Sequence, residues 1–279
     1  MTRTRVIAAL ILTPIAIAAI LLLPTPWLAA LAAVVFLAGL WEWFRLADVE
    51  DTLARTILLV VNLALMVAIV WGSRTSHGFS YVLLQLGTVI GVAWWLVALI
   101  WLRHFEFGAD HSRAHARISK LAAGTLAIVP AWCALGVLHG SEDGGHRWLF
   151  IALAIVWAAD SGAYFAGRRF GKRKLSPRIS PNKTVEGLFG GLASGLLVAL
   201  VFAPFAGAGL AQLPLVALAA LAAVLFSVVG DLFESLLKRH VGAKDSGDLI
   251  PGHGGILDRI DGVVAALPVF ALAKAWLGF

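Results

Sequence analysis

Residues 213–237, LPLVALAALAAVLFSVVGDLFESLL, form a long apolar run that leads into the charged segment KRHVGAKD. At about 1.5 Å per residue, a helix of this length crosses the hydrocarbon core of a bilayer, which is about 30 Å thick. The rest of the chain has the same character, because 60% of its 279 residues are hydrophobic and only 14% are charged. A soluble domain is usually about one quarter charged. The sequence therefore predicts an all-α, polytopic membrane protein.

Several other runs are long enough to cross a bilayer. With the first, they predict nine transmembrane helices, at residues 6–23, 27–44, 56–72, 80–102, 118–138, 148–167, 184–206, 213–237 and 262–278. About five of them form an N-terminal group in residues 1–140, and the others form a C-terminal group in residues 141–279. The first run follows Arg3 and Arg5, as the core of a signal peptide would, but its 18 residues exceed the usual length of about 7–15. We therefore expect it to be retained as the first membrane helix.

Basic residues are distributed unevenly between the two ends of these helices. If the N-terminus is cytoplasmic, 19 of the 22 Lys and Arg residues fall on the cytoplasmic side, and only Arg74, Arg147 and Lys274 fall on the other. Lys and Arg concentrate on the cytoplasmic side of membrane proteins. The sequence thus predicts a cytoplasmic N-terminus and a C-terminus on the opposite side. The net charge of +6 also favours contact with anionic head groups or phosphates.

Asp160 lies inside the sixth predicted helix and Asp231 inside the eighth. Each is roughly 10–12 Å from the predicted cytoplasmic end of its helix. A carboxylate at that depth is costly unless it has a partner, a cation or water. Ser235 and Lys238 follow Asp231 on the same helix face, at i+4 and i+7. We predict a polar cavity open to the cytoplasm, although pairing of Asp160 with a neighbouring helix is the structural alternative.

A basic segment follows the sixth predicted helix, and its last part, SPNKTVEG, leads into the seventh. This part contains Ser180, Asn182, Lys183 and Thr184. Hydroxyls, free N–H groups and a lysine at a helix N-terminus are well suited to hold a phosphate. A basic run can equally act as a topology signal that holds anionic lipid. The spacing is not that of a P-loop, so a phosphate site here would be of another kind.

The residue types near these acids restrict the chemistry. Two carboxylates in one cavity repel each other unless a cation lies between them. Oxygen ligands without His or Cys clusters favour Mg²⁺ over Zn²⁺, and Mg²⁺ commonly accompanies phosphate substrates. No Ser or Cys is paired with a His in register, so we expect no covalent nucleophile. The residues alone therefore predict Mg²⁺-dependent phosphate chemistry in a membrane-embedded cavity.

The polar segment SLLKRHVGAKDSGDLIPGHGGILDRID, residues 235–261, resembles the phosphatidate cytidylyltransferases, also called CDP-diacylglycerol synthases. In that family a Ser is followed at fixed spacings by Lys-Arg, Lys-Asp, His-Gly-Gly and a closing Asp-Arg-x-Asp. The matching positions are Ser235, Lys238, Arg239, Lys244, Asp245, Gly247, His253, Gly254, Gly255, Asp258, Arg259 and Asp261. DSGAYFAGRRFGK and SPNKTVEG also look like family blocks, with Asn182 where a Gly is often found. WEWFRLA at residues 41–47 is a weaker match.

The resemblance implies the reaction of CTP with phosphatidate to give CDP-diacylglycerol and diphosphate, carried out by the C-terminal group of helices. It implies Mg²⁺ on Asp231 and Asp258, with Asp261 in support, and basic side chains on the phosphates. The catalytic residues implied are Asp231, Lys238, Arg239, Lys244, Asp245, His253, Asp258, Arg259 and Asp261. The substrate-binding residues implied are Asp160, Ser180, Asn182, Lys183, Thr184, Ser235, Gly254 and Gly255. For His253, between glycines, a simple turn role is the alternative.

The implied partners are CTP, phosphatidate and the lipid bilayer, without any nucleic acid. The implied location is a bacterial cytoplasmic (inner) membrane, with the active site facing the cytoplasm. A homodimer and a second, monovalent cation such as K⁺ are left open.

Three alternatives can be weighed against this interpretation. A CTP-dependent lipid-alcohol kinase of the dolichol kinase kind shares part of the pattern. A CDP-alcohol phosphotransferase is disfavoured, because DGVVAAL at residues 261–267 lacks the Arg of the Asp-Gly-x-x-Ala-Arg pattern. A transporter should have polar groups at both ends of its conduit, whereas here they concentrate at one end, and no sequence repeat of the transporter kind is visible.

Overall fold

The computed structural model describes residues 13–104, 114–142, 144–248 and 254–279. Within these ranges, eight helices are long and apolar enough to cross a membrane. They are α2 (Thr25–Leu46), α3 (Thr52–Gly72), α4 (Val82–His104), α5 (Ala114–His139), α6 (Gly145–Phe170), α7 (Val185–Phe202), α8 (Leu213–His240) and α9 (Leu257–Leu277). The prediction of an all-α, polytopic membrane protein is confirmed. A shorter apolar helix, Thr13–Leu22, precedes them; because residues 1–12 lie outside the described part, the total of nine stays a prediction.

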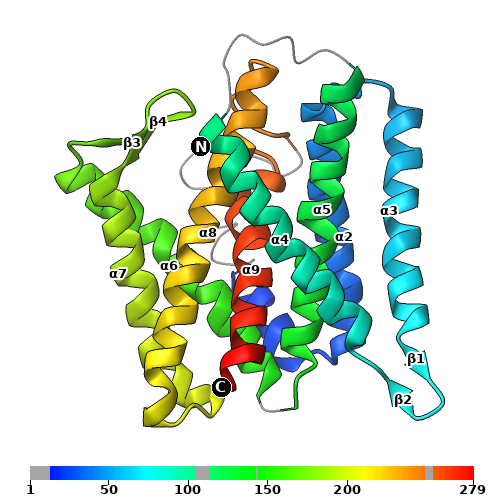
Figure 1. The fold of residues 1–279 in the computed structure, drawn as a ribbon, viewed down its shortest axis with the longest axis vertical. Coiled ribbons are helices and arrows are strands. Elements are labelled where there is room, and N and C mark those ends of the chain that lie inside the picture. Colours follow the sequence, from blue (N-terminus) through cyan, green and yellow to red (C-terminus); the bar gives the residue numbers. More distant parts are fainter. Residues whose placement is uncertain (1–12, 105–113, 143, 249–253) are drawn as a thin grey trace.

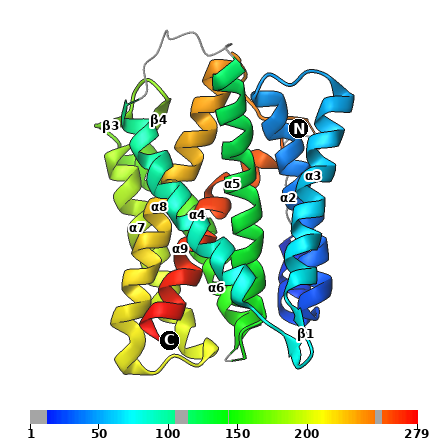
Figure 2. The ribbon, with the colours of Figure 1, turned by 45° about the vertical axis from the view of Figure 1, so that its right-hand side comes forward.

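The helices pack side by side along one long axis (Figure 1). α5 and α9 lie inside the bundle, whereas α3 lies at its edge in both ribbon views (Figures 1 and 2). α3 accordingly keeps only Asn62 and Met66 buried. α6 and α8 both end at the end of the bundle that carries strands β3 (Lys174–Ser176) and β4 (Ser180–Thr184), and the C-terminus lies at the other end. The predicted common direction of these two helices is therefore correct.

An aromatic cluster joins α8 to the N-terminal helices. The Phe233 ring stacks on Trp43 of α2, with centroids 5.9 Å apart, and meets the rings of Trp94, Trp95 and Trp101 of α4 edge to face. Such pairs add to the stabilisation that burial alone provides. Because residues two apart on a helix point to opposite sides, Phe233 anchors α8 while Asp231 points away from the cluster.

Glycines allow α6 and α7 to pack at very short distance. Gly187, Gly191 and Gly195 are spaced four apart, which predicts close helix contact in a membrane. A Cβ added at Gly187 would lie 2.9 Å from the carbonyl oxygen of Ala163, and one at Gly191 would lie 2.9 Å from that of Ala159. The packing role of these glycines is confirmed.

Two short antiparallel hairpins connect helices, β1 (Arg74–Thr75) with β2 (Gly78–Phe79), and β3 with β4. The second hairpin was expected only as a loop. Its position is fixed by Glu186, whose carboxylate accepts hydrogen bonds from the backbone N–H groups of Lys172 and Arg173 and from Arg173 Nε, at 3.0, 3.1 and 3.2 Å. This arrangement ties the residues directly before β3 to the first turn of α7.

Candidate active site

A cavity of about 570 Å³ lies between α6, β4, α7 and α8. Apolar side chains such as Ala163, Leu188 and Val228 form part of its wall. The predicted site residues that line it are Asp160, Ser180, Asn182, Lys183, Thr184 and Asp231. The prediction that the two helix acids share one cavity is therefore confirmed, and the basic segment supplies the opposite wall.

Asp231 is the centre of the polar contacts in this cavity. Lys183, at the end of β4, forms an ion pair with one Asp231 oxygen, and Ser235 Oγ donates a hydrogen bond to the other at 3.3 Å. The Ser235 contact confirms the shared helix face that the i, i+4 spacing predicts. Asp160 on α6 interacts electrostatically with both Asp231 and Lys183.

Asp261 of α9 approaches the same group of charges. α8 and α9 cross at Gly230, where an added Cβ would collide with the Asp261 carbonyl oxygen. The Asp261 carboxyl interacts electrostatically with Asp231 and with Lys183. Asp160 and Asp261 thus add negative charge near the Asp231–Lys183 ion pair, and this excess of negative charge suits a bound cation.

Lys238 and Asp258 form a second polar cluster, about two helical turns beyond Asp231 along α8. Lys238 Nζ lies 2.6 Å from Glu234 Oε2 and 2.6 Å from Asp258 Oδ1. The other Asp258 oxygen accepts hydrogen bonds from the backbone N–H groups of Ser246 and Gly255, at 3.0 and 3.1 Å. Both carboxylate oxygens of Asp258 therefore have partners within the protein, as those of Asp231 do, but Asp231 lines the cavity and Asp258 does not.

The remaining predicted residues lie around these two clusters. Arg239 Nε donates to the carbonyl oxygen of Ile179 at 3.2 Å, which ties the end of α8 to the β3–β4 turn. Lys244, Asp245 and Arg259 are exposed outside the cavity lining. Gly254 has a positive φ of 82°, and its position beside Asp258 leaves little room for a side chain. His253 lies outside the described residues.

Thr184 supplies the N-cap of α7, and its Oγ1 accepts a hydrogen bond from the Gly187 N–H at 3.1 Å. Ser180, Asn182 and Lys183 lie in strand β4 and not in a helical turn. The predicted phosphate-binding group is therefore a strand that ends at a helix N-terminus. The Gly187 N–H, one of the groups expected to face a phosphate, already donates its hydrogen bond to Thr184.

Sequence reasoning missed three residues that organise the second cluster, Glu42, Glu234 and Ser246. Glu42 and Glu234 lie inside predicted apolar helices, so the argument that singled out Asp160 could have found both. Ser246 gives no such signal, because an isolated Ser in a polar segment is common.

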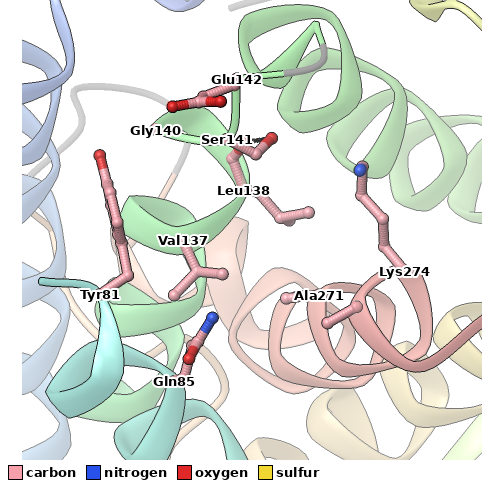
Figure 3. A pocket seen from close by; sticks show the side chains of 10 residues that line it. Tyr81, Gln85, Val137, Leu138, Gly140, Ser141, Glu142, Ala271 and Lys274 are labelled. Atoms are coloured by element: carbon pink, nitrogen blue, oxygen red, sulfur yellow. Dashed lines mark hydrogen bonds between the residues drawn. The ribbon is translucent and has the colours of Figure 1, made fainter. Parts of the chain in front are cut away.

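A second cavity, of about 300 Å³, lies at the other end of the bundle, where α5 and α9 end (Figure 3). Tyr81, Gln85, Ser141, Glu142 and Lys274 contribute polar groups to its lining. It contains none of the predicted site residues, and it lacks the two aspartates, Asp160 and Asp231, that line the first cavity.

Known proteins resemble the chain over nearly its whole length. The model of the cytidylyltransferase family matches residues 3–276. The phosphatidate cytidylyltransferase of Pseudomonas aeruginosa is 39% identical over 279 residues, which cover 99% of this chain and 97% of the relative. The enzyme of the same name from Haemophilus influenzae is 38% identical over 285 residues, with 97% and 98% covered. That from Bacillus subtilis is 48% identical over 135 residues, about half of each chain. With these matches, the chain belongs to the cytidylyltransferase family.

Proposed function

We propose that the protein transfers the cytidylyl group of CTP to phosphatidate, forming CDP-diacylglycerol and diphosphate. The observation that carries this proposal is the cavity between membrane helices that Asp160, Asp231 and Lys183 line together, with Asp231 and Lys183 forming an ion pair. A charged cavity with an apolar wall suits a substrate that joins a phosphate to acyl chains. Two relatives named phosphatidate cytidylyltransferase, similar over nearly the full length, agree with it.

In the proposed reaction, a phosphate oxygen of phosphatidate attacks the α-phosphorus of CTP. The new P–O bond forms as the bond to the bridging oxygen of the β-phosphate breaks, and diphosphate leaves with that electron pair. Such a transfer depends mainly on positioning and on neutralising phosphate charge. Lys183 lines the cavity and would exchange its contact with Asp231 for one with a phosphate, whereas Lys238 lies outside the lining, paired with Glu234 and Asp258. The lipid phosphate is already ionised near neutral pH, so no general base is required.

Mg²⁺ fits the donor set, because the cavity offers carboxylate oxygens without a cluster of His or Cys. Mg²⁺ is often bound by only one or two carboxylates together with substrate phosphates. Among the described residues no group of three or more His, Cys, Asp or Glu side chains is arranged as a metal site. When bound, the ion would supply charge neutralisation at the phosphate oxygens.

We assign Asp231 as the first ligand of this ion, with Asp258 as the second and Asp261 in support. To bind the ion, Asp231 would have to exchange Lys183 or Ser235, and Asp258 would have to exchange Lys238, Ser246 or Gly255. Among the contacts described, Asp261 would not have to give up a basic partner to bind the ion. The monovalent cation and the homodimer stay predictions.

We further place the protein in a bacterial cytoplasmic membrane with the active site facing the cytoplasm. The β3–β4 end of the bundle carries the basic residues that the positive-inside rule assigns to the cytoplasm. CTP, a cytoplasmic nucleotide, would then reach the cavity from that end, and phosphatidate would reach it from the bilayer.

The proposal is tested with purified protein, phosphatidate vesicles, Mg²⁺ and CTP labelled at the α- or the γ-phosphate. Label from the α-phosphate should appear in the lipid, with diphosphate released in equal amount. Label from the γ-phosphate would instead support the lipid-alcohol kinase. If folded protein forms neither CDP-diacylglycerol nor diphosphate, the proposed function is wrong.

A further inference from the structure

Glu42 of α2 is a buried carboxylate in the N-terminal half that contacts the polar segment before α9. Its side chain is only 3% exposed. Its Oε1 accepts a hydrogen bond from the Ile256 N–H at 3.1 Å, and its Oε2 accepts one from the Leu257 N–H at 2.8 Å. Ser246 Oγ lies 2.9 Å from the same Oε2. The partners are more than 200 residues away in sequence.

These contacts replace a missing helix cap. The first N–H groups of a helix have no partner within the helix, and its N-terminus carries a partial positive charge. No side chain at the start of α9 caps it, because the N-cap residue is Ile256. Glu42 therefore supplies, from another helix, acceptor atoms for the first N–H groups of α9, and it adds its negative charge to that of Asp258 in the first turn.

Two glycines make room for the Glu42 carboxylate. A Cβ added at Gly247 would collide with Glu42 Oε1, and one at Gly255 would collide with Glu42 Oε2. Both glycines are buried, as is Ser246. The segment on either side of residues 249–253 is thus folded around this carboxylate.

Ser246 contacts both Glu42 and Asp258, and Gly255, which also binds Asp258, directly precedes the Ile256 N–H that Glu42 binds. Ser246 N and Gly255 N donate to Asp258 Oδ2, and Ser246 Oγ lies 3.0 Å from that oxygen. The second oxygen of Asp258 pairs with Lys238. A continuous set of polar contacts thus leads from Glu42 to two residues that are predicted to act on the substrates.

We propose that Glu42 is a positioning residue for the reaction: it fixes the segment around Ser246 and Gly255, and thereby holds Asp258 and Lys238 in place. The expected effect on turnover rests on the proposed function, whereas the expected effect on the order of the segment does not. Glu42 itself is enclosed, so it acts through these residues and not on the substrates.

The kinetic test compares Glu42→Gln with a matched control, Glu50→Gln, an exposed carboxylate just after α2. Gln keeps the size of Glu42 but replaces one acceptor oxygen with an NH₂ group that faces N–H donors. Since hydrogen bonds to a charged group are among the strong ones, we expect kcat to fall about 10- to 100-fold, with unchanged protein yield and a KM for phosphatidate within about threefold. Ser246→Ala should give the same profile, and the double variant should lose less than the product of the two single losses.

The structural test does not depend on activity. A spin label at Asp248→Cys, in a Cys133→Ala background, reports the motion of the segment. The label should become more mobile when Glu42→Gln is added, and should not change when Glu50→Gln is added. Wild-type kcat in Glu42→Gln, or a loss explained entirely by a smaller folded fraction, would overturn the positioning role. Unchanged label mobility would overturn the structural part, whereas an inactive wild type with a responsive label would count against the proposed function alone.

Discussion

Replacing Lys238 with Met should destabilise the protein by about 3–5 kcal/mol, because breaking a buried ion pair leaves an uncompensated charge. Lys238 lies 2.6 Å from both Glu234 and Asp258, and the Glu234 side chain is only 1% exposed. Met has a similar length and retains most of the apolar contacts. The substitution therefore removes a charge and little packing. The loss of stability should appear in the free energy of unfolding whether or not the variant turns over substrate.

A second substitution separates this cause from a packing defect. Glu234→Gln removes the buried charge that Lys238→Met exposes to an apolar environment, so the double variant should recover most of the lost stability. Unfolding in denaturant, followed by intrinsic Trp fluorescence in detergent, measures all three variants, and Lys172→Met at an exposed site is the control. The reasoning is refuted if Lys238→Met is as stable as the wild type, or if Glu234→Gln restores nothing in its background.

Three further outcomes are expected. Asp231→Asn should abolish CDP-diacylglycerol formation while membrane insertion is retained, and Asp258→Asn should do the same; full activity of both would exclude their metal role. Removal of divalent ions with a chelator should stop turnover, and added Mg²⁺ should restore it; turnover that persists after exhaustive chelation would contradict the Mg²⁺ assignment. Gly191→Val should cost about 1–3 kcal/mol in unfolding free energy by overpacking α6 against α7, whereas Gly209→Ala, whose added Cβ has no neighbour closer than 3.8 Å, should be neutral.

The helices were predictable because hydropathy and length decide what can cross a bilayer. The run predicted at 118–138 corresponds to α5, Ala114–His139, and the one at 262–278 to α9, Leu257–Leu277. The common depth of Asp160 and Asp231 was predictable for the same reason, since both positions follow from helix rise and from the direction of each helix.

The partners of the polar residues could not be predicted in the same way. The β3–β4 hairpin is only a few residues long and contains Pro177 and Pro181, so no alternating apolar pattern indicates its strands. The pairing of Asp258 with Lys238, and not directly with Asp231, depends on how α8 and α9 cross at Gly230. No local pattern encodes the approach of Glu42 to Leu257, because it arises only when the bundle is assembled.

The contacts of α2 and α4 with the C-terminal helices have a consequence for how small this enzyme can be made. Trp95 Nε1 donates a hydrogen bond to the Val264 carbonyl oxygen at 3.1 Å, Trp43 stacks on Phe233, and Glu42 caps α9. A fragment that begins at residue 141 would contain Asp160, Lys183 and both polar clusters, yet it would lack all three supports. The N-terminal helices are therefore not a detachable membrane anchor, and a minimal catalytic unit must include them.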